Sequence, residues 1–169
     1  MQNVLWILIG LMLVACGEQR RWPAEITGCV DCSTDDQAQV KQSIIDLNEK
    51  SGGTLLIPQS DGANKRFPID LSFVDPKVIQ PTDDSRNTRA ALATLYDDHC
   101  SIQLSKELHK PENANYFKAV LWHELGHCAG LVHDKDEKEI MFPITQKIQA
   151  YSEEVILRFI NEFRNSAHL

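Results

Sequence analysis

The sequence predicts a single α+β domain, and three observations support this fold class. Apolar residues recur at helical spacing in three segments, short apolar or alternating segments lie between the first two, and the order is helix, several strands, helix, irregular segment, helix. The 169 residues, 43% hydrophobic and 24% charged, suffice for one core and are too few for a second full domain. This composition excludes a disordered chain, a collagen-like repeat and a multi-pass membrane protein.

The chain begins with a segment that is typical of an export signal. Val4 to Ala15 is a run of twelve uncharged, mostly apolar residues, too short to span a membrane as a helix but suited to a signal-peptide core. It ends in Leu13-Val14-Ala15-Cys16, which resembles the lipobox of bacterial lipoproteins and implies cleavage before Cys16 and a lipid on that residue. We expect residues 1–15 to be a signal peptide and the protein to be exported and lipid-anchored to a bacterial membrane, at the outer membrane, in the periplasm or at the cell surface. Cleavage without lipidation is the alternative.

A tether and then the folded domain are expected to follow. Residues 16–32 are mostly polar, contain Pro23 and Gly28 and show no sustained periodicity, which predicts a tether ahead of a domain at 33–169. Ser33 or Thr34 can cap a first helix that Gly52 ends.

Strands and two further helices are expected in the rest of the domain. Asn113 or Asn115 can cap a second helix that runs to about Cys128, before Gly130, and Ser152 can cap a third. Short apolar or alternating segments predict strands at 54–57, 67–73, 78–80, 90–96 and 101–105.

The five cysteines divide into one lipidation site and four that can pair. In an oxidising compartment, four cysteines other than Cys16 predict two disulfides, with three possible connectivities among which the sequence does not choose. We favour Cys29 with Cys32 and Cys100 with Cys128. A structural zinc ribbon is disfavoured because Cys100 and Cys128 stand 28 positions apart.

The net charge bears on possible partners. Seventeen basic and 24 acidic residues give a charge of −7, which repels phosphate backbones, so nucleic acid is not expected as a partner. We expect a monomer.

One segment carries the chemistry: His123-Glu124-Leu125-Gly126-His127-Cys128-Ala129-Gly130-Leu131-Val132-His133. Side chains four apart on a helix share a face, so His123 and His127 can bind one ion, at about 2.0 to 2.1 Å for zinc. Gly130 can end the helix in the left-handed conformation and return His133 as a third ligand. Three imidazoles and one water would make an open, catalytic type of zinc site, with Glu124 in reach of the water.

These residues resemble the metzincin zinc proteases, whose pattern H-E-x-x-H-x-x-G-x-x-H precedes a methionine turn. Every fixed position matches, and Met141 in Glu139-Ile140-Met141-Phe142-Pro143 is similar to the turn of the matrixin branch, whereas Asp134 is more similar to the adamalysin branch. The resemblance implies a mixed twisted sheet with two helices above an active-site cleft, and a small lower subdomain that ends in a C-terminal helix.

The same resemblance implies a zinc-dependent endopeptidase that cleaves polypeptides with a zinc-bound water activated by Glu124. Ala119, Pro143, Ile144 and Thr145 would then line the S1′ pocket, which receives the residue after the cleaved bond. Substrate would add as a strand to a sheet edge, for which the candidate is Ser101, Ile102, Gln103, Leu104 and Ser105.

Other sites and other functions have weaker support. His99, His109 and His168 have no partner at ligand spacing and are expected to be solvated. A calcium ion could use oxygens of Asp83-Asp84 or Asp97-Asp98, although adjacent acids are usually solvated turns. Two rival interpretations are a lipid-anchored zinc-binding or adhesion module without turnover, which would not need Glu124, and an exported lipoprotein in which the histidines are incidental.

Overall fold

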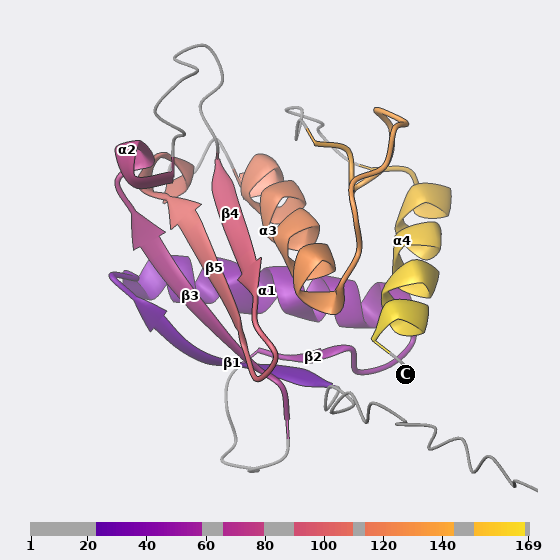
Figure 1. Ribbon diagram of the computed structural model, residues 1–169, viewed down its shortest axis with the longest axis horizontal. Coiled ribbons are helices and arrows are strands. Elements are labelled where there is room, and N and C mark those ends of the chain that lie inside the picture. The colour runs from indigo at the N-terminus through magenta and orange to yellow at the C-terminus, as the bar shows by residue number, and fades with distance from the viewer. Residues whose placement is uncertain (1–22, 59–65, 80–89, 110–113, 144–150, 168–169) are drawn as a thin grey trace, which may run out of the picture.

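The structure, a computed structural model, describes residues 23–58, 66–79, 90–109, 114–143 and 151–167. It contains a five-stranded mixed sheet with helices packed on it and beside it (Figure 1). The predicted α+β class is therefore confirmed. Within the described ranges, no helix combines the length and the apolar character that crossing a membrane requires.

The sheet is mainly parallel, with one antiparallel strand at an edge. Its order is β2-β1-β3-β5-β4; β1 pairs in parallel with β2 and β3, and β5 in parallel with β3, whereas β4 runs antiparallel to β5. The strands are β1 (Ala24–Val30), β2 (Leu56–Ile57), β3 (Pro68–Val74), β4 (Ala91–Leu95) and β5 (Cys100–Ser105).

The three long helices begin and end close to where the sequence predicts. They are α1 (Thr34–Ser51), α3 (Ala114–Ala129) and α4 (Glu153–Ser166). Ser33 and Asp36 form a capping box at the start of α1, and Ser152 caps α4. Gly52 (φ 66°) and Gly130 (φ 95°) adopt the left-handed conformation that ends α1 and α3.

Three expectations about strands and tether are wrong. Residues 24–30, predicted as tether, form β1, whose Ala24, Glu25 and Ile26 are buried because both β2 and β3 flank the strand. The strand predicted at 78–80 is instead the short helix α2 (Pro76–Ile79), which Pro76 suits as a first helical residue and Asp75 caps through the Lys77 amide. Ser101 to Ser105 lies in β5, which is internal, so it is not the edge of the sheet.

Helix α3 is fixed to the rest of the domain on several sides. The Trp122 indole Nε1 donates to the Ser43 carbonyl of α1 at 2.9 Å, and Lys118 Nζ lies 3.0 Å from Asp46. Cys128 at its end is bonded to Cys100 at the start of β5, with 5.6 Å between the Cα atoms. Because α3 carries two of the three candidate ligands, His123 and His127, these contacts position the site.

Candidate metal centre

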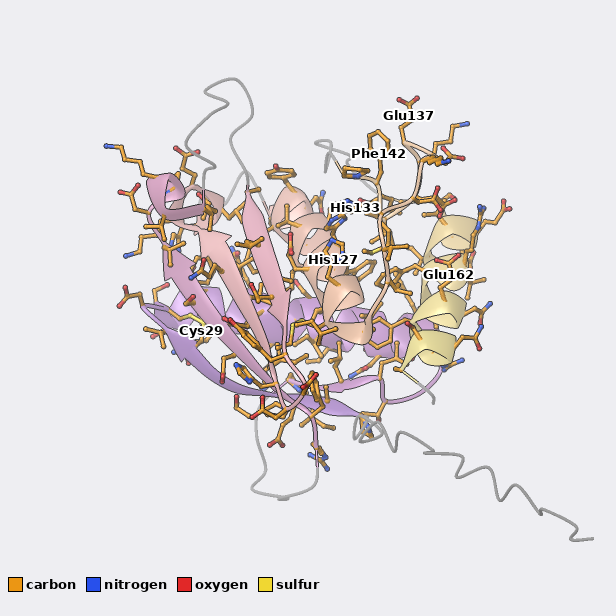
Figure 2. All side chains as sticks on the ribbon, viewed as in Figure 1. Cys29, His127, His133, Glu137, Phe142 and Glu162 are labelled. Atoms are coloured by element: carbon orange, nitrogen blue, oxygen red, sulfur yellow. A yellow bond between two sulfur atoms is a disulfide. The ribbon has the colours of Figure 1, made fainter. Side chains whose placement is uncertain are left out.

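The last two turns of α3 and the loop after it supply three histidines. His123 is buried, His127 is half-buried, and His133 is exposed. The turn at Gly130 is held by the Leu131 amide, which donates to the Gly126 carbonyl at 2.9 Å. The chain then returns between α3 and α4, so that His133 lies close to His127 (Figures 1 and 2).

The Nε2 atoms of the three imidazole rings converge. Nε2 of His127 lies 3.1 Å from Nε2 of His123 and 3.1 Å from Nε2 of His133, and the three ligand atoms lie within 4.8 Å of one another. Among the described residues, the side chains of type His, Cys, Asp or Glu that cluster closely enough to hold a metal ion are these three histidines. The predicted ligands are therefore brought together as expected.

The other ring nitrogens fix the orientation of two of these imidazoles. His123 Nδ1 donates to the Ile140 carbonyl at 2.7 Å, and His127 Nδ1 donates to the Leu131 carbonyl at 2.9 Å. A carbonyl can only accept, so each ring carries its proton on Nδ1 and presents the lone pair of Nε2. Three neutral imidazoles directed at one point fit zinc.

Electrostatics favour the neutral form that a metal needs. The pKa of His123 is lowered to about 4, mainly by burial and also by His127 and His133, while the hydrogen bond to Ile140 opposes the shift. Burial and His127 lower the pKa of His133 as well. Protonation therefore competes weakly with a cation at neutral pH.

Glu124 follows the first histidine directly and is 7% exposed. It belongs to the same turn of α3 as His123 and precedes His127 by three positions. A carboxylate so placed suits the predicted role of a base beside the ligands.

Met141 lies in a tight turn that packs beneath the helix, as the methionine turn predicts. The Phe142 amide donates to the Glu139 carbonyl at 3.2 Å and closes the turn, and Met141 is 3% exposed. A Cβ added at Gly126 would overlap Met141 Sδ and lie 3.0 Å from Phe159 Cε2. No role for Gly126 is predicted from the sequence. Its position on α3 between His123 and His127 could have indicated one, because only a glycine lets the loop that carries Met141 approach the helix so closely there.

Of the predicted S1′ residues, the structure describes two. Ala119 is buried one turn before His123 on α3, and Pro143 is exposed after Met141. Ile144 and Thr145 lie outside the described residues. Tyr116 on α3 and Tyr151 are half-buried, and burial raises the pKa of both, that of Tyr151 to about 12.

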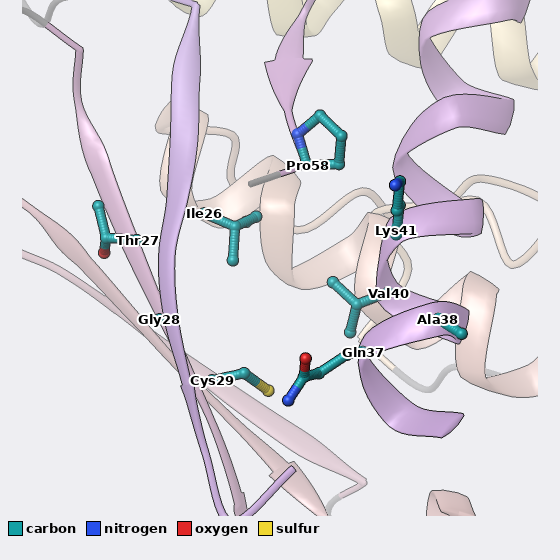
Figure 3. A pocket seen from close by; sticks show the side chains of 9 residues that line it. All are labelled: Ile26, Thr27, Gly28, Cys29, Gln37, Ala38, Val40, Lys41 and Pro58. Carbon is teal, nitrogen blue, oxygen red and sulfur yellow. The ribbon is translucent and has the colours of Figure 1, made fainter. Parts of the chain in front are cut away.

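The remaining predicted residues include the four cysteines that were expected to form disulfides. Cys29 is bonded to Cys32 at the turn from β1 to α1, so both disulfides pair as favoured from the sequence. A cavity of about 300 Å³ between β1 and α1 is lined by Cys29, Gln37 and Lys41 among others and by no histidine of the triad (Figure 3).

Two histidines differ from the prediction that they are solvated. His109 is half-buried, bonded to Asp36 and packed on Phe73 with 4.3 Å between ring centroids, and His99 bonds to Asp98 and stacks on Tyr96. Residues 83, 84 and 168 lie outside the described ranges, as does Cys16, and among the described residues Asp97 and Asp98 belong to no cluster of metal-binding groups.

Comparison with known proteins identifies one family. A family model described as Matrixin matches residues 25–157, which is most of the chain and includes the three histidines, Glu124 and Met141. No curated protein matches the sequence significantly.

Proposed function

The chain belongs to the matrixin family of zinc metallopeptidases, and from this premise we propose that it is an endopeptidase in which Glu124 is the general base. The observation that carries the proposal is the convergence of three Nε2 atoms within 4.8 Å, next to a buried glutamate. A site that only stored zinc would not need this carboxylate.

His123, His127 and His133 would hold the zinc ion. When bound, zinc supplies Lewis acidity, which polarises a peptide carbonyl and lowers the pKa of water to about 7. Glu124 would accept the proton of the attacking water and return it to the nitrogen of the leaving amine. The exposure of His133 leaves one side of the centre open to a substrate.

An extended polypeptide would bind along β4. Among the described residues this strand is an edge of the sheet, and it packs beside α3, which supports strand addition next to the metal centre. Ala119, Pro143, Ile144 and Thr145 would line the S1′ pocket.

A peptide-library assay tests the proposal. We expect the purified protein to cleave internal bonds, to lose this activity on chelation and to regain it when one equivalent of zinc is returned. Stoichiometric zinc without cleavage of any library member would contradict the proposal and favour the rival zinc-binding or adhesion module.

We also propose that the protein is exported and anchored by a lipid on Cys16, as the lipobox-like Leu13-Val14-Ala15-Cys16 suggests. Metabolic labelling with a fatty acid should mark the wild type and not Cys16→Ala. Equal labelling, or a mature N-terminus elsewhere, would contradict this anchor.

A further inference from the structure

The loop between His133 and Met141 contains a backbone carbonyl that is hydrogen-bonded to His123. The Asp134 amide donates to the Met141 carbonyl at 2.9 Å and closes the loop. Within it, the Ile140 carbonyl accepts from His123 Nδ1 at 2.7 Å. The orientation of the His123 ring therefore depends on where the loop holds Ile140.

Glu139, the residue before Ile140, is an acid in a buried position. Its side chain is 8% exposed, and its carboxylate lies 2.7 Å from Nη1 of Arg158 on α4. Burial raises the pKa of Glu139, Asp134, Asp136 and Glu162 raise it further, and Arg158 opposes them. Figure 2 shows Glu162 on α4 and Glu137 at the outer end of the loop. Arg158 therefore favours the charged form of this buried carboxylate.

We propose that Arg158 is a positioning residue for the metal centre: its ion pair with Glu139 holds the Ile140 carbonyl against His123. The inference rests on the zinc site of the proposed function, and it does not depend on peptide cleavage.

Loss of the cation has a predictable local result. A buried carboxylate without its partner either takes up a proton or turns toward water, because an unpaired buried charge is costly. Either change loosens the peptide between Glu139 and Ile140. His123 Nδ1 then loses a fixed acceptor, and its Nε2 is no longer held toward the other two ligands. Changes to partners of metal-binding histidines typically weaken metal affinity about 10- to 100-fold.

The test measures zinc affinity by competition with a chromogenic chelator. Arg158→Met removes the cation and keeps most of the side-chain volume. Glu139→Gln removes the negative charge itself, so that no unpaired carboxylate is left in the buried position. We expect each to weaken zinc binding about tenfold. In the double variant the two effects should not add, because both break one interaction.

Two control variants separate this role from general stability of α4. Glu154→Gln removes the second partner of Arg158, which lies 3.6 Å away and is 87% exposed. Arg164→Met removes a bond from α4 to the Ser51 carbonyl, at the end of α1. Both should leave zinc affinity within about twofold of wild type, the scatter expected away from the site.

Histidine side-chain NMR of the zinc-free protein provides a second readout. We expect the Nδ1 proton of His123 to exchange faster in Arg158→Met and Glu139→Gln, and that of His127 to be unchanged. If Arg158→Met does not fold, Glu139→Gln alone decides. Wild-type zinc affinity with an unchanged His123 signal, or additive effects in the double variant, would overturn the proposal. Tight zinc binding without cleavage would overturn only the proposed endopeptidase.

Discussion

At the scale of single residues, two of the three candidate ligands, His123 and His127, are held by a backbone carbonyl at the ring nitrogen that faces away from the site. The spacing of His123 and His127 made their shared face predictable, because a helix repeats every 3.6 residues. The carbonyls of Ile140 and Leu131 that fix these rings could not be predicted, because each depends on where an irregular loop returns.

The smallest of these residues gives a stability prediction. In Gly126→Ala the new Cβ would overlap Met141 Sδ and crowd Phe159 Cε2 at 3.0 Å, so we expect a loss of about 1–3 kcal/mol in the free energy of unfolding. Urea denaturation measures this loss. Gly53→Ala is the matched control, since its Cβ would meet only Arg164 Nη2 at 3.9 Å. Equal stability of the two variants would show that Met141 does not depend on Gly126.

At the scale of elements, the predictions succeeded where local chemistry decides and failed where pairing decides. Caps at Ser33 and Ser152 and left-handed glycines mark helix ends directly in the sequence. β1 was missed because a polar stretch with Pro23 and Gly28 resembles a linker, and only its two neighbouring strands make it a strand. Strand order is likewise not local, which is why β5 was mistaken for an edge.

The start of α1 yields a prediction of pH dependence. Burial raises the pKa of Asp36, but hydrogen bonds from Ser33 and His109 outweigh this, and the net pKa is below its ordinary 3.8. Because the folded-state pKa is the lower one, the stabilisation is present above 3.8 and is lost as the pH falls through the folded-state value.

Urea unfolding at a series of pH values from about 6 down to about 2.5, a range that spans the ordinary Asp pKa, measures this loss. We expect stability to fall less steeply with acid in Asp36→Asn than in wild type. Asp35→Asn, at the exposed neighbouring position, should follow the wild type. Parallel curves for all three proteins would contradict a role of Asp36.

At the scale of the whole molecule, two disulfides cross-link the fold. Cys100–Cys128 ties β5 to the end of α3 across 28 positions, whereas Cys29–Cys32 closes a turn of three. Because a longer loop removes more entropy from the unfolded chain, replacing the first pair by alanine should cost about 4 kcal/mol and the second about 2 kcal/mol.

Urea denaturation of the two double variants checks this order. Non-reducing peptide mass mapping tests the pairing itself: Cys29 joined to Cys100 or Cys128 would contradict the account. The sequence alone left three connectivities open, and the choice among them depends on the fold, which brings each pair to 5.6 Å between Cα atoms.

The central claim is that Glu124 performs acid–base chemistry beside a three-histidine zinc site. The most direct test compares kcat/KM on one cleaved peptide for zinc-loaded wild type and zinc-loaded Glu124→Ala, with Glu137→Ala, in the exposed part of the loop, as control. We predict a loss of about 10²- to 10⁴-fold in Glu124→Ala with zinc retained, and wild-type turnover in the control. Equal turnover of Glu124→Ala and wild type at equal zinc content would contradict the claim.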